Sequence, residues 1–295
     1  MGAASVRLRE LLGREEIVLV PGVGTALEAR LVEEAGFEAV YMSGYATAAA
    51  VYGEPDIGLI AGAEMIANAA AIRLATSLPL IADADTGYGD VSNVRAIVRR
   101  MAAAGADAVQ IEDQVWPKRC GHMEGKEVES ATAMERKLAA AVRGRDGGTP
   151  LIVARTDARA THGLSEAIER AGRYAAAGAD VVFIDAPESR EELATIGAAG
   201  IAAPLMANIS ETGKTPLLPL AELEELGFAI VIYPTSALRV AAHALARFYA
   251  DLREQGDSKA WLSSMMPLER LNAAVGFEDE LALQAWALDA HGGDR

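Results

Sequence analysis

The feature that most constrains the fold of this chain is a short apolar phrase that recurs along it. AGFEAVYMSG, AGADAVQIED and AGADVVFIDA begin at Ala35, Ala104 and Ala177, and looser versions occur in AAGIAAPLMAN and ELGFAIVIYP. Each phrase has a glycine where a helix would end, followed by an apolar run typical of a buried strand. With VLVPG, LPLIADAD and LIVARTD, eight strands are predicted, beginning near residues 18, 38, 78, 108, 151, 181, 203 and 228.

Alternation of these strands with helical stretches predicts an α/β fold with a parallel sheet. Strands that are apolar throughout indicate that both faces of the sheet are covered. Eight such units favour a (β/α)₈ barrel of the TIM type over an open doubly wound sheet, which has about five or six strands. The open sheet is the alternative. No linker or low-complexity tract divides the 295 residues, so we expect a single barrel domain over residues 1–295.

The two ends of the chain have separate predictions. The first residues, MGAASVRLRELLGREE, lack the apolar core of a signal peptide and predict an amphipathic leading helix. After Arg239 the chain becomes helical, and Trp261 and Trp286 lie there in segments too apolar to remain in solvent. We expect residues from about 240 to 295 to form C-terminal helices that cover the barrel or pack on another subunit.

Composition disfavours several classes of protein. Lys and Arg number 27 and Asp and Glu 42, so the formal charge is −15, which argues against nucleic acid as a partner. The single cysteine excludes an internal disulfide framework and a thiolate metal cluster. No apolar segment reaches the roughly 18 residues of a membrane span. We therefore expect a cytoplasmic protein that binds a small molecule, which can be anionic only where cations or a metal overcome the overall charge.

Polar residues close most of the predicted strands. In a barrel, the carboxyl ends of the strands converge on one mouth, where barrel enzymes place their chemistry. The alternative is that strand ends are polar only because loops begin there, but carboxylates inside apolar runs are costly unless paired. The residues concerned are Ser43, Gly44, Asp83, Asp85, Glu112, Asp113, Arg155, Asp157, Asp185, Asn208, Thr235 and Ser236.

The pair Asp83 and Asp85, in PLIADADTGYG, predicts a metal site. Residues two apart in a strand point the same way, so the two carboxylates face one confined space and require a cation. Oxygen ligands suit Mg²⁺, or alternatively Mn²⁺, better than zinc. Glu112, at the end of the next strand, can join directly or through water. Helix capping by Asp85, or a pair with Arg155, are the alternative roles.

Two loops carry further candidate residues. Ser43, Gly44 and Tyr45 follow a buried strand, where backbone N–H groups and a hydroxyl could bind a carboxylate, although a plain tight turn explains them equally well. PKRCGHMEGK, residues 117–126, follows the fourth predicted strand and holds the only cysteine. Its glycines would allow it to act as a lid over the mouth.

Cys120 sits in that loop beside three residues that can carry positive charge. Lys118, Arg119 and His122 would stabilise its thiolate, so the thiol could exchange a proton at neutral pH. A proton donor under a lid fits carbanion chemistry. An exposed basic turn with an incidental cysteine is the other interpretation.

Eight motifs in this order resemble the isocitrate lyase and phosphoenolpyruvate mutase superfamily, above all its short methylisocitrate lyase and dimethylmalate lyase branch. They are YMSGY, GEPDIGL, DADTGYG, IEDQ, PKRCGH, ARTDA, ANISETGKTP and IYPTSALR, within roughly residues 10–255. The resemblance implies a barrel whose last helix is exchanged between subunits, usually in a dimer of dimers. It also implies Mg²⁺ that holds an α-oxy acid at the mouth.

The resemblance implies a role for each matched residue. Asp83 and Asp85 would hold the metal and its waters, Cys120 would protonate the departing enolate-like fragment, and Tyr41 would take the substrate's hydroxyl proton. The supporting metal residues would be Asp56 and Glu112, and the other catalytic residues Lys118, Arg155 and His122. The substrate-binding residues would be Ser43, Gly44, Tyr45, Arg119, Gly121, Asp185, Asn208, Ser236 and Arg239.

The reaction implied is cleavage of a carbon–carbon bond in a 2-hydroxy di- or tricarboxylate of the 2-methylisocitrate or 2,3-dimethylmalate type. The products are pyruvate or another 2-oxo acid and a second carboxylate. Asp185 stands where the branch usually has glutamate, and Arg239 fits an additional carboxylate, so a substituted malate and a tricarboxylate both remain open. The alternatives are a carboxyphosphonoenolpyruvate-type phosphonomutase, an oxaloacetate decarboxylase and a non-catalytic acid-binding barrel.

Overall fold

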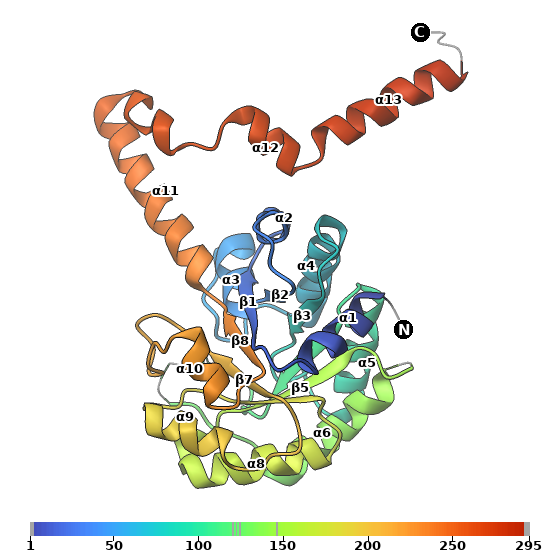
Figure 1. The fold of residues 1–295 in the computed structure, drawn as a ribbon, viewed down its shortest axis with the longest axis vertical. Coiled ribbons are helices and arrows are strands. Elements are labelled where there is room, and N and C mark those ends of the chain that lie inside the picture. The colour runs from blue at the N-terminus through green and yellow to red at the C-terminus, as the bar shows by residue number, and fades with distance from the viewer. Residues whose placement is uncertain (1–2, 120, 122, 124, 146, 292–295) are drawn as a thin grey trace. The chain divides into compact units, whose positions relative to one another are not determined.

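The computed structural model describes residues 3–119, 121, 123, 125–145 and 147–291, drawn in Figure 1. The chain forms two compact units, Met1–Leu238 and Arg239–Arg295. The described part of the first unit contains eight parallel strands in chain order, closed into a barrel. The last strand pairs with the first, with Ile230 opposite Val18. The predicted (β/α)₈ fold is confirmed, and the open doubly wound sheet is wrong.

Each strand begins within two residues of its predicted position. The apolar runs are buried on both faces, inside the barrel and under the helices, as expected for parallel strands. The strands are β1 (Val18–Val23), β2 (Val40–Met42), β3 (Leu80–Asp83), β4 (Ala108–Glu112), β5 (Leu151–Thr156), β6 (Val181–Ile184), β7 (Leu205–Asn208) and β8 (Ile230–Tyr233).

Helices follow the strands and form the outer layer of the first unit (Figure 1). The longer ones are α2 (Ala26–Glu34), α4 (Gly62–Ala75), α5 (Val91–Ala103), α6 (Ala131–Gly144), α8 (Leu164–Ala176), α9 (Arg190–Gly197) and α10 (Leu220–Glu225). Three short helical segments lie just after strands β2 and β5, and they are α3 (Gly44–Thr47), the π-helix η1 (Ala48–Tyr52) and α7 (Ala158–His162). None of the described helices is long and apolar enough to cross a membrane.

The predicted leading helix is α1 (Ala3–Leu12), and it closes the amino end of the barrel. Leu8 and Leu11 are buried in the same cluster as the inward-facing residues at the start of the strands. The Ser5 hydroxyl donates to Asp107 Oδ1 at 2.6 Å, which fastens the helix at that end. Burial of two leucines contributes about 1.5–3 kcal/mol each, so α1 is part of the barrel core.

The recurring AGAD phrase has a direct structural meaning. Gly105 ends α5 with a φ of +91°, a left-handed conformation that glycine adopts without strain. Two residues later, Asp107 accepts the backbone N–H of Leu80 at 3.0 Å and pairs with Arg73 at 3.3 Å. The aspartate therefore ties strand β3 and helix α4 to the amino end of β4.

The other two copies of the phrase repeat this arrangement in whole or in part. Asp180 accepts the backbone N–H of Ile152 at 2.8 Å and forms an ion pair with Arg145. Glu38, in the first copy, pairs with Arg14 at 3.0 Å. We call Glu38, Asp107 and Asp180 the amino-end acids, because all three precede a strand at the end of the barrel opposite its mouth.

The second unit consists of helices, as predicted for residues from about 240. They are the later part of α11 (Ser236–Gln255), the 3-10 helix η2 (Lys259–Ser264), α12 (Leu268–Ala274) and α13 (Phe277–His291). Trp261 packs edge-on against Phe248 at 5.7 Å and donates its indole N–H to Asp251 at 2.9 Å. Trp286 is 62% exposed, and no described side chain between 239 and 288 is buried. Burial of Trp286 against another subunit therefore stays a prediction.

Candidate active site

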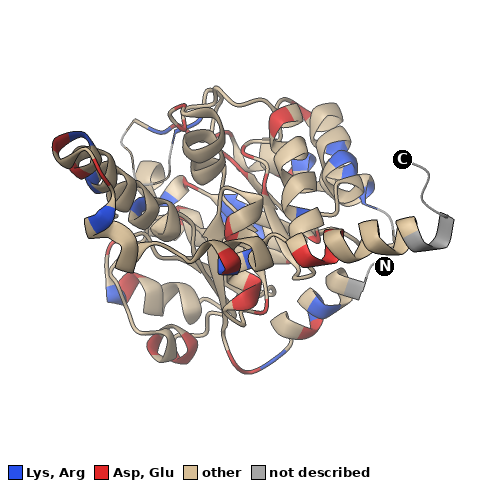
Figure 2. Cartoon of the chain, turned by 90° about the horizontal axis from the view of Figure 1, so that it is seen from above, with Lys and Arg blue, Asp and Glu red and all other residues tan. Residues whose placement is uncertain are grey.

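Charged side chains crowd the carboxyl ends of the strands, which form the mouth of the barrel. Figure 2 shows both signs of charge among the strands at the centre of the first unit. Buried charges are costly unless each has a partner, so their contacts define what the site can do. The buried charged and amide residues at the mouth are Asp83, Asp85, Gln110, Glu112, Lys118, Lys126, Arg155, Asp157, Asp185 and Asn208.

Asp83 and Asp85 converge on the backbone of Gly44. Asp83 Oδ2 accepts the Gly44 N–H at 3.2 Å, and a Cβ at Gly44 would lie 2.9 Å from that oxygen and 3.6 Å from Asp85 Oδ1. The structure differs from the expected single strand, because β3 ends at Asp83 and Asp85 has a left-handed φ of +48°. Strained backbone of this kind is typical of functional sites, and here it turns the two carboxylates toward the same space.

The oxygen atoms around Asp83 and Asp85 suit Mg²⁺ as ligands. Burial raises the pKa of Asp83 above its ordinary value, and the charge of Asp85 raises it further. Gln110 Oε1 and Glu112 Oε1 are buried without a hydrogen-bond partner among the described residues. Within that part of the chain no three acidic, histidine or cysteine side chains converge closely enough to hold an ion by themselves. Mg²⁺ suits such a set because it keeps several waters and takes one or two carboxylates.

Lys118 lies between two acidic residues from different loops. Its ammonium is 2.7 Å from Asp85 Oδ1 and also contacts Asp56 Oδ1. Burial alone would lower the pKa of Lys118, but Asp85 and Asp56 outweigh it and hold the pKa well above its ordinary value. Lys118 is therefore a fixed positive charge at the mouth. Asp56 was predicted to support the metal. In the structure its carboxylate forms an ion pair with Lys118.

Arg155 is held along one edge by carboxylates. Its Nε and Nη2 donate to the two oxygens of Asp157 at 2.9 Å each, and Nε lies 3.3 Å from Glu112 Oε2. Nη2 lies 3.3 Å from Asp185 Oδ2, and the guanidinium stacks over the ring of Phe183 at 5.3 Å. Among the described residues Nη1 has no partner, so this nitrogen can bind a carboxylate of a substrate.

Lys126 is a site residue that the sequence analysis did not single out. Its ammonium lies 2.7 Å from Asp157 Oδ1 and 3.3 Å from Asp185 Oδ2, and it donates to the Gly121 carbonyl. All three side chains are buried, with exposed fractions of 0% for the two aspartates. The sequence did contain a signal that could have indicated Lys126. The predicted strand ends carry more carboxylates than cations, so Asp157 had no cationic partner assigned to it.

A buried network behind the mouth holds Asp157 in place. Asp113 accepts the backbone N–H of Asp157 at 2.9 Å and the Thr156 hydroxyl at 2.7 Å. The Tyr174 hydroxyl donates to Asp113 at 2.8 Å, and Arg170 pairs with it at 3.1 Å. Because each of these groups is buried and paired, the network fixes the β5 end that carries Arg155 and Asp157.

The structure gives the surroundings of three site residues predicted around strand β2. Ser43 Oγ accepts the Ala46 N–H at 3.2 Å and so caps helix α3, while Tyr45 is 39% exposed. Tyr41 is buried inside the barrel, and burial followed by the charge of Asp83 raises its pKa well above the ordinary value. A raised pKa keeps the phenol neutral. A neutral phenol can donate a hydrogen bond, and the role of Tyr41 as the base stays a prediction.

The predicted substrate-binding residues divide into those at the mouth and those elsewhere. Gly121 lies against the mouth, because a Cβ there would be 2.1 Å from Asp185 Oδ2. Asn208 donates to Asp185 Oδ1 at 3.4 Å. The Arg119 side chain is exposed and lines a cavity of about 450 Å³ over the loop. Ser236 donates to Glu211 at 2.5 Å.

Three predicted residues are not placed at the mouth by the structure. Arg239 belongs to the second unit, so its position relative to the mouth is not given. Cys120 and His122 lie outside the described residues. Gln114 anchors the start of their loop, since its side chain accepts the Arg119 N–H at 2.9 Å and donates to the Arg119 carbonyl at 2.8 Å.

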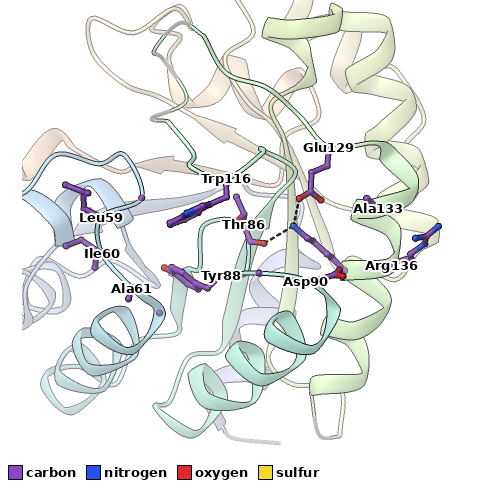
Figure 3. Close-up of a pocket in the computed structure, with 14 residues that line it drawn as sticks. Leu59, Ile60, Ala61, Thr86, Tyr88, Asp90, Trp116, Glu129, Ala133 and Arg136 are labelled. Carbon is purple, nitrogen blue, oxygen red and sulfur yellow. Dashed lines mark hydrogen bonds and ion pairs between the residues drawn. The ribbon is translucent and has the colours of Figure 1, made fainter.

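A second cavity, of about 670 Å³, lies beside the aspartate pair (Figure 3). Its apolar part includes Tyr88 and Trp116, whose rings meet edge to face at 6.3 Å. At its polar part Lys137 pairs with Glu129 at 2.8 Å. The Tyr88 hydroxyl donates to Asp85 Oδ2 at 3.0 Å, so the wall of this cavity also supports the predicted metal site.

The closed barrel and the buried carboxylates and cations at its mouth define an enzyme that acts on small carboxylates. The family model described as phosphoenolpyruvate phosphomutase matches residues 8–253. The chain belongs to the phosphoenolpyruvate mutase and isocitrate lyase superfamily, which confirms the resemblance inferred from the motifs.

Characterised relatives and solved structures are similar over nearly the whole chain. The 2,3-dimethylmalate lyase of Eubacterium barkeri is 43% identical over 93% of this chain and 94% of its own length. The 2-methylisocitrate lyase of Halalkalibacterium halodurans is 42% identical, with 94% and 91% covered. A crystal structure of 2,3-dimethylmalate lyase has a TM-score of 0.92, 36% identity and coverage of 100% and 99%. Phosphonopyruvate hydrolase in complex with oxalate and Mg²⁺ has a TM-score of 0.87, 28% identity and coverage of 96% and 99%.

Proposed function

We propose that this protein is a Mg²⁺-dependent lyase that breaks a carbon–carbon bond in a 2-hydroxy dicarboxylate of the 2,3-dimethylmalate type. A 2-methylisocitrate-type tricarboxylate is the second candidate substrate. The observation that carries the proposal is that one mouth holds both the Asp83–Asp85 pair and an Arg155 guanidinium with Nη1 directed away from its carboxylate partners. The first feature suits a metal, and the second suits the carboxylate of an α-oxy acid.

The metal site would consist of Asp83 and Asp85 with waters, supported by Glu112. When bound, Mg²⁺ would supply positive charge next to the oxygen that becomes the 2-oxo group, and Mn²⁺ is the alternative ion. Lys118 adds a second fixed positive charge, because its pairs with Asp85 and Asp56 keep it protonated. Charges placed before the reaction begins stabilise the transition state more than they stabilise the substrate.

The reaction proposed is a retro-aldol cleavage. Arg155 Nη1 binds the carboxylate next to the hydroxyl-bearing carbon, and the Tyr41 phenol donates a hydrogen bond to the developing oxyanion. The hydroxyl proton passes to water at the mouth, the carbon–carbon bond breaks, and a carbon–oxygen double bond forms. The bonding electron pair stays with the departing fragment and is delocalised into its own carboxylate. Cys120 then supplies the proton that ends on that carbon.

The surroundings of strand β8 favour a dicarboxylate over a tricarboxylate. Arg239 was the residue expected near an additional carboxylate, and Ser236 was expected to bind the substrate. In the structure the Ser236 hydroxyl donates its proton to Glu211, so it has no proton to donate to a further carboxylate. Asp185 is engaged by Lys126, Arg155 and Asn208, so its carboxylate supports the site and does not itself bind the substrate.

The first test is release of a 2-oxo acid from four substrates, each with Mg²⁺ and again with a chelator. The panel is 2,3-dimethylmalate, 2-methylisocitrate, isocitrate and oxaloacetate. We expect Mg²⁺-dependent release from 2,3-dimethylmalate, with a smaller rate on 2-methylisocitrate, because the Ser236 hydroxyl already donates to Glu211. A folded protein that releases nothing from the panel would contradict the lyase, and phosphonate substrates would then be the next to test.

Removal of the thiol tests the proton donor. Cys120→Ala should lower 2-oxo acid release by at least about a hundredfold, the usual loss when a general acid is removed. Binding of oxalate in the presence of Mg²⁺, measured by calorimetry, should not change, because Cys120 acts on the other fragment. Met123→Ala, in the same loop and 51% exposed, is the control and should keep full activity. Retained turnover in Cys120→Ala would refute the role of the thiol.

We also propose that the protein is a cytoplasmic homo-oligomer, a dimer of dimers in which the second unit packs on a neighbouring subunit. The support is the large number of apolar side chains left exposed between 240 and 288. They include Val240, Leu245, Tyr249, Leu262, Leu268, Phe277, Leu283 and Trp286. Exposed apolar side chains in this number are typical of subunit interfaces.

A further inference from the structure

Lys126 connects the loop after β4 to the ends of β5 and β6. Its ammonium contacts Asp157, Asp185 and the Gly121 carbonyl, and no solvent reaches the two carboxylates. Burial alone would lower the pKa of Lys126, but Asp157 and Asp185 outweigh it and raise the pKa. The lysine is therefore a permanent cation buried behind the guanidinium of Arg155.

The same two aspartates hold Arg155. Asp157 accepts hydrogen bonds from Nε and Nη2 of Arg155. Asp185 Oδ2 lies 3.3 Å from Arg155 Nη2 and 3.3 Å from Lys126 Nζ. Asp185 thus divides its charge between two cations. The backbone of Gly121 packs closely against this arginine, since a Cβ on Gly121 would lie 2.4 Å from Arg155 Nη2.

Without Lys126, Asp185 would keep Arg155 as a cationic partner. A carboxylate beside one end of a guanidinium readily takes the bidentate arrangement, with one oxygen on each terminal nitrogen. A small rotation of Asp185 would then place its second oxygen on Nη1. That nitrogen is the one available for the carboxylate of the substrate.

We propose that Lys126 is a positioning residue that keeps Arg155 Nη1 open for the substrate by competing for Asp185. The proposal rests on the proposed function, because it assigns Nη1 to the carboxylate of an α-oxy acid. Lys126 does not touch the reacting atoms and acts through Asp185. Its loss therefore weakens carboxylate binding more than it slows the bound complex.

The test is the affinity for oxalate with Mg²⁺, measured by calorimetry, together with KM and kcat for 2-oxo acid release. Lys126→Met should raise the Kd for oxalate and the KM by at least about tenfold, with a smaller change in kcat. Lys126→Arg, which keeps the charge, should stay within about threefold of the parent protein. Lys137→Met is the matched control. Lys137 is also a buried lysine, and its ammonium binds the Glu129 carboxylate and the Thr86 carbonyl. This variant should leave the Kd unchanged.

A double variant separates positioning from structural damage. Lys126→Met combined with Asp185→Asn removes the competing charge and should recover most of the lost oxalate affinity. The proposal is overturned if Lys126→Met binds oxalate as tightly as the parent protein, or if the double variant binds no better than the single one. A parent protein that binds oxalate with Mg²⁺ but cleaves no substrate of the panel would refute the lyase alone. A parent protein that binds no oxalate would refute both.

Discussion

Asp85→Asn is expected to lower 2-oxo acid release by at least about a thousandfold, the scale of effect seen when a group that stabilises transition-state charge is removed. Asp85 is one half of the predicted metal pair and the partner of Lys118 at 2.7 Å. Asparagine keeps the size of the side chain and its hydrogen bond with Tyr88 but removes the negative charge. Asp83 would then face the cation without its partner, and the affinity for Mg²⁺ should fall together with the rate.

The measurement is the initial rate over a titration of Mg²⁺, with Mg²⁺ binding determined separately by calorimetry. Asp90→Asn is the matched control, because Asp90 lies in the same loop and only caps α5 through the Val91 N–H. Asparagine caps helices as well as aspartate, so this variant should stay within about twofold of the parent protein. A rate for Asp85→Asn within about tenfold of the parent protein would remove the metal from the proposed mechanism.

Arg155→Met is expected to destabilise the fold by about 3–5 kcal/mol and to abolish oxalate binding. The guanidinium is the shared partner of Glu112, Asp157 and Asp185, all of which are buried. Methionine would leave Asp157 and Asp185 with Lys126, and it would remove the ion pair of Glu112. Uncompensated buried charge is the costly outcome, so stability and substrate binding should fall together.

Urea denaturation and calorimetry with oxalate measure the two effects separately. Arg159→Met is the control, since Arg159 binds Glu188 and Glu192 at a site nearer the surface. It should cost about 1 kcal/mol or less and leave oxalate affinity intact. If Arg155→Met still binds oxalate with the affinity of the parent protein, the carboxylate site lies elsewhere in the barrel.

Most of the fold was predictable from the sequence because its signals are local. A glycine that ends a helix and a run of valine and isoleucine identify a strand wherever they occur, and the AGAD copies at Gly105 and Gly178 carry both signals. Whether apolar side chains of the second unit are buried could not be predicted from such local signals. Trp286 is a large apolar residue, yet it is 62% exposed, and no local sequence signal states what would cover it.

The site was predictable only where the strands themselves place the residues. Asp83, Glu112 and Arg155 end strands, and the barrel brings them together. Loop residues follow tertiary contacts that leave no periodic pattern. Lys118 is buried while the adjacent Arg119 is exposed, in a loop that belongs to no strand or helix.

Lys126 and Tyr41 show two other limits of the sequence. The role of Lys126 depends on how the loop returns to β5 and β6, which no local motif encodes. The role of Tyr41 depends on its pKa, which burial raises, and burial is a property of the finished barrel.

The amino-end acids have a practical consequence for anyone who wishes to improve this protein. A five-residue strand spans about 16 Å, so the pairs of Glu38, Asp107 and Asp180 with their arginines lie well away from the reacting groups. Substitutions that far apart usually add their effects independently. A library of substitutions around the amino-end acids could therefore be selected for thermal stability alone, without an assay of turnover. The selected substitutions could then be combined with substitutions at the mouth that change the substrate range.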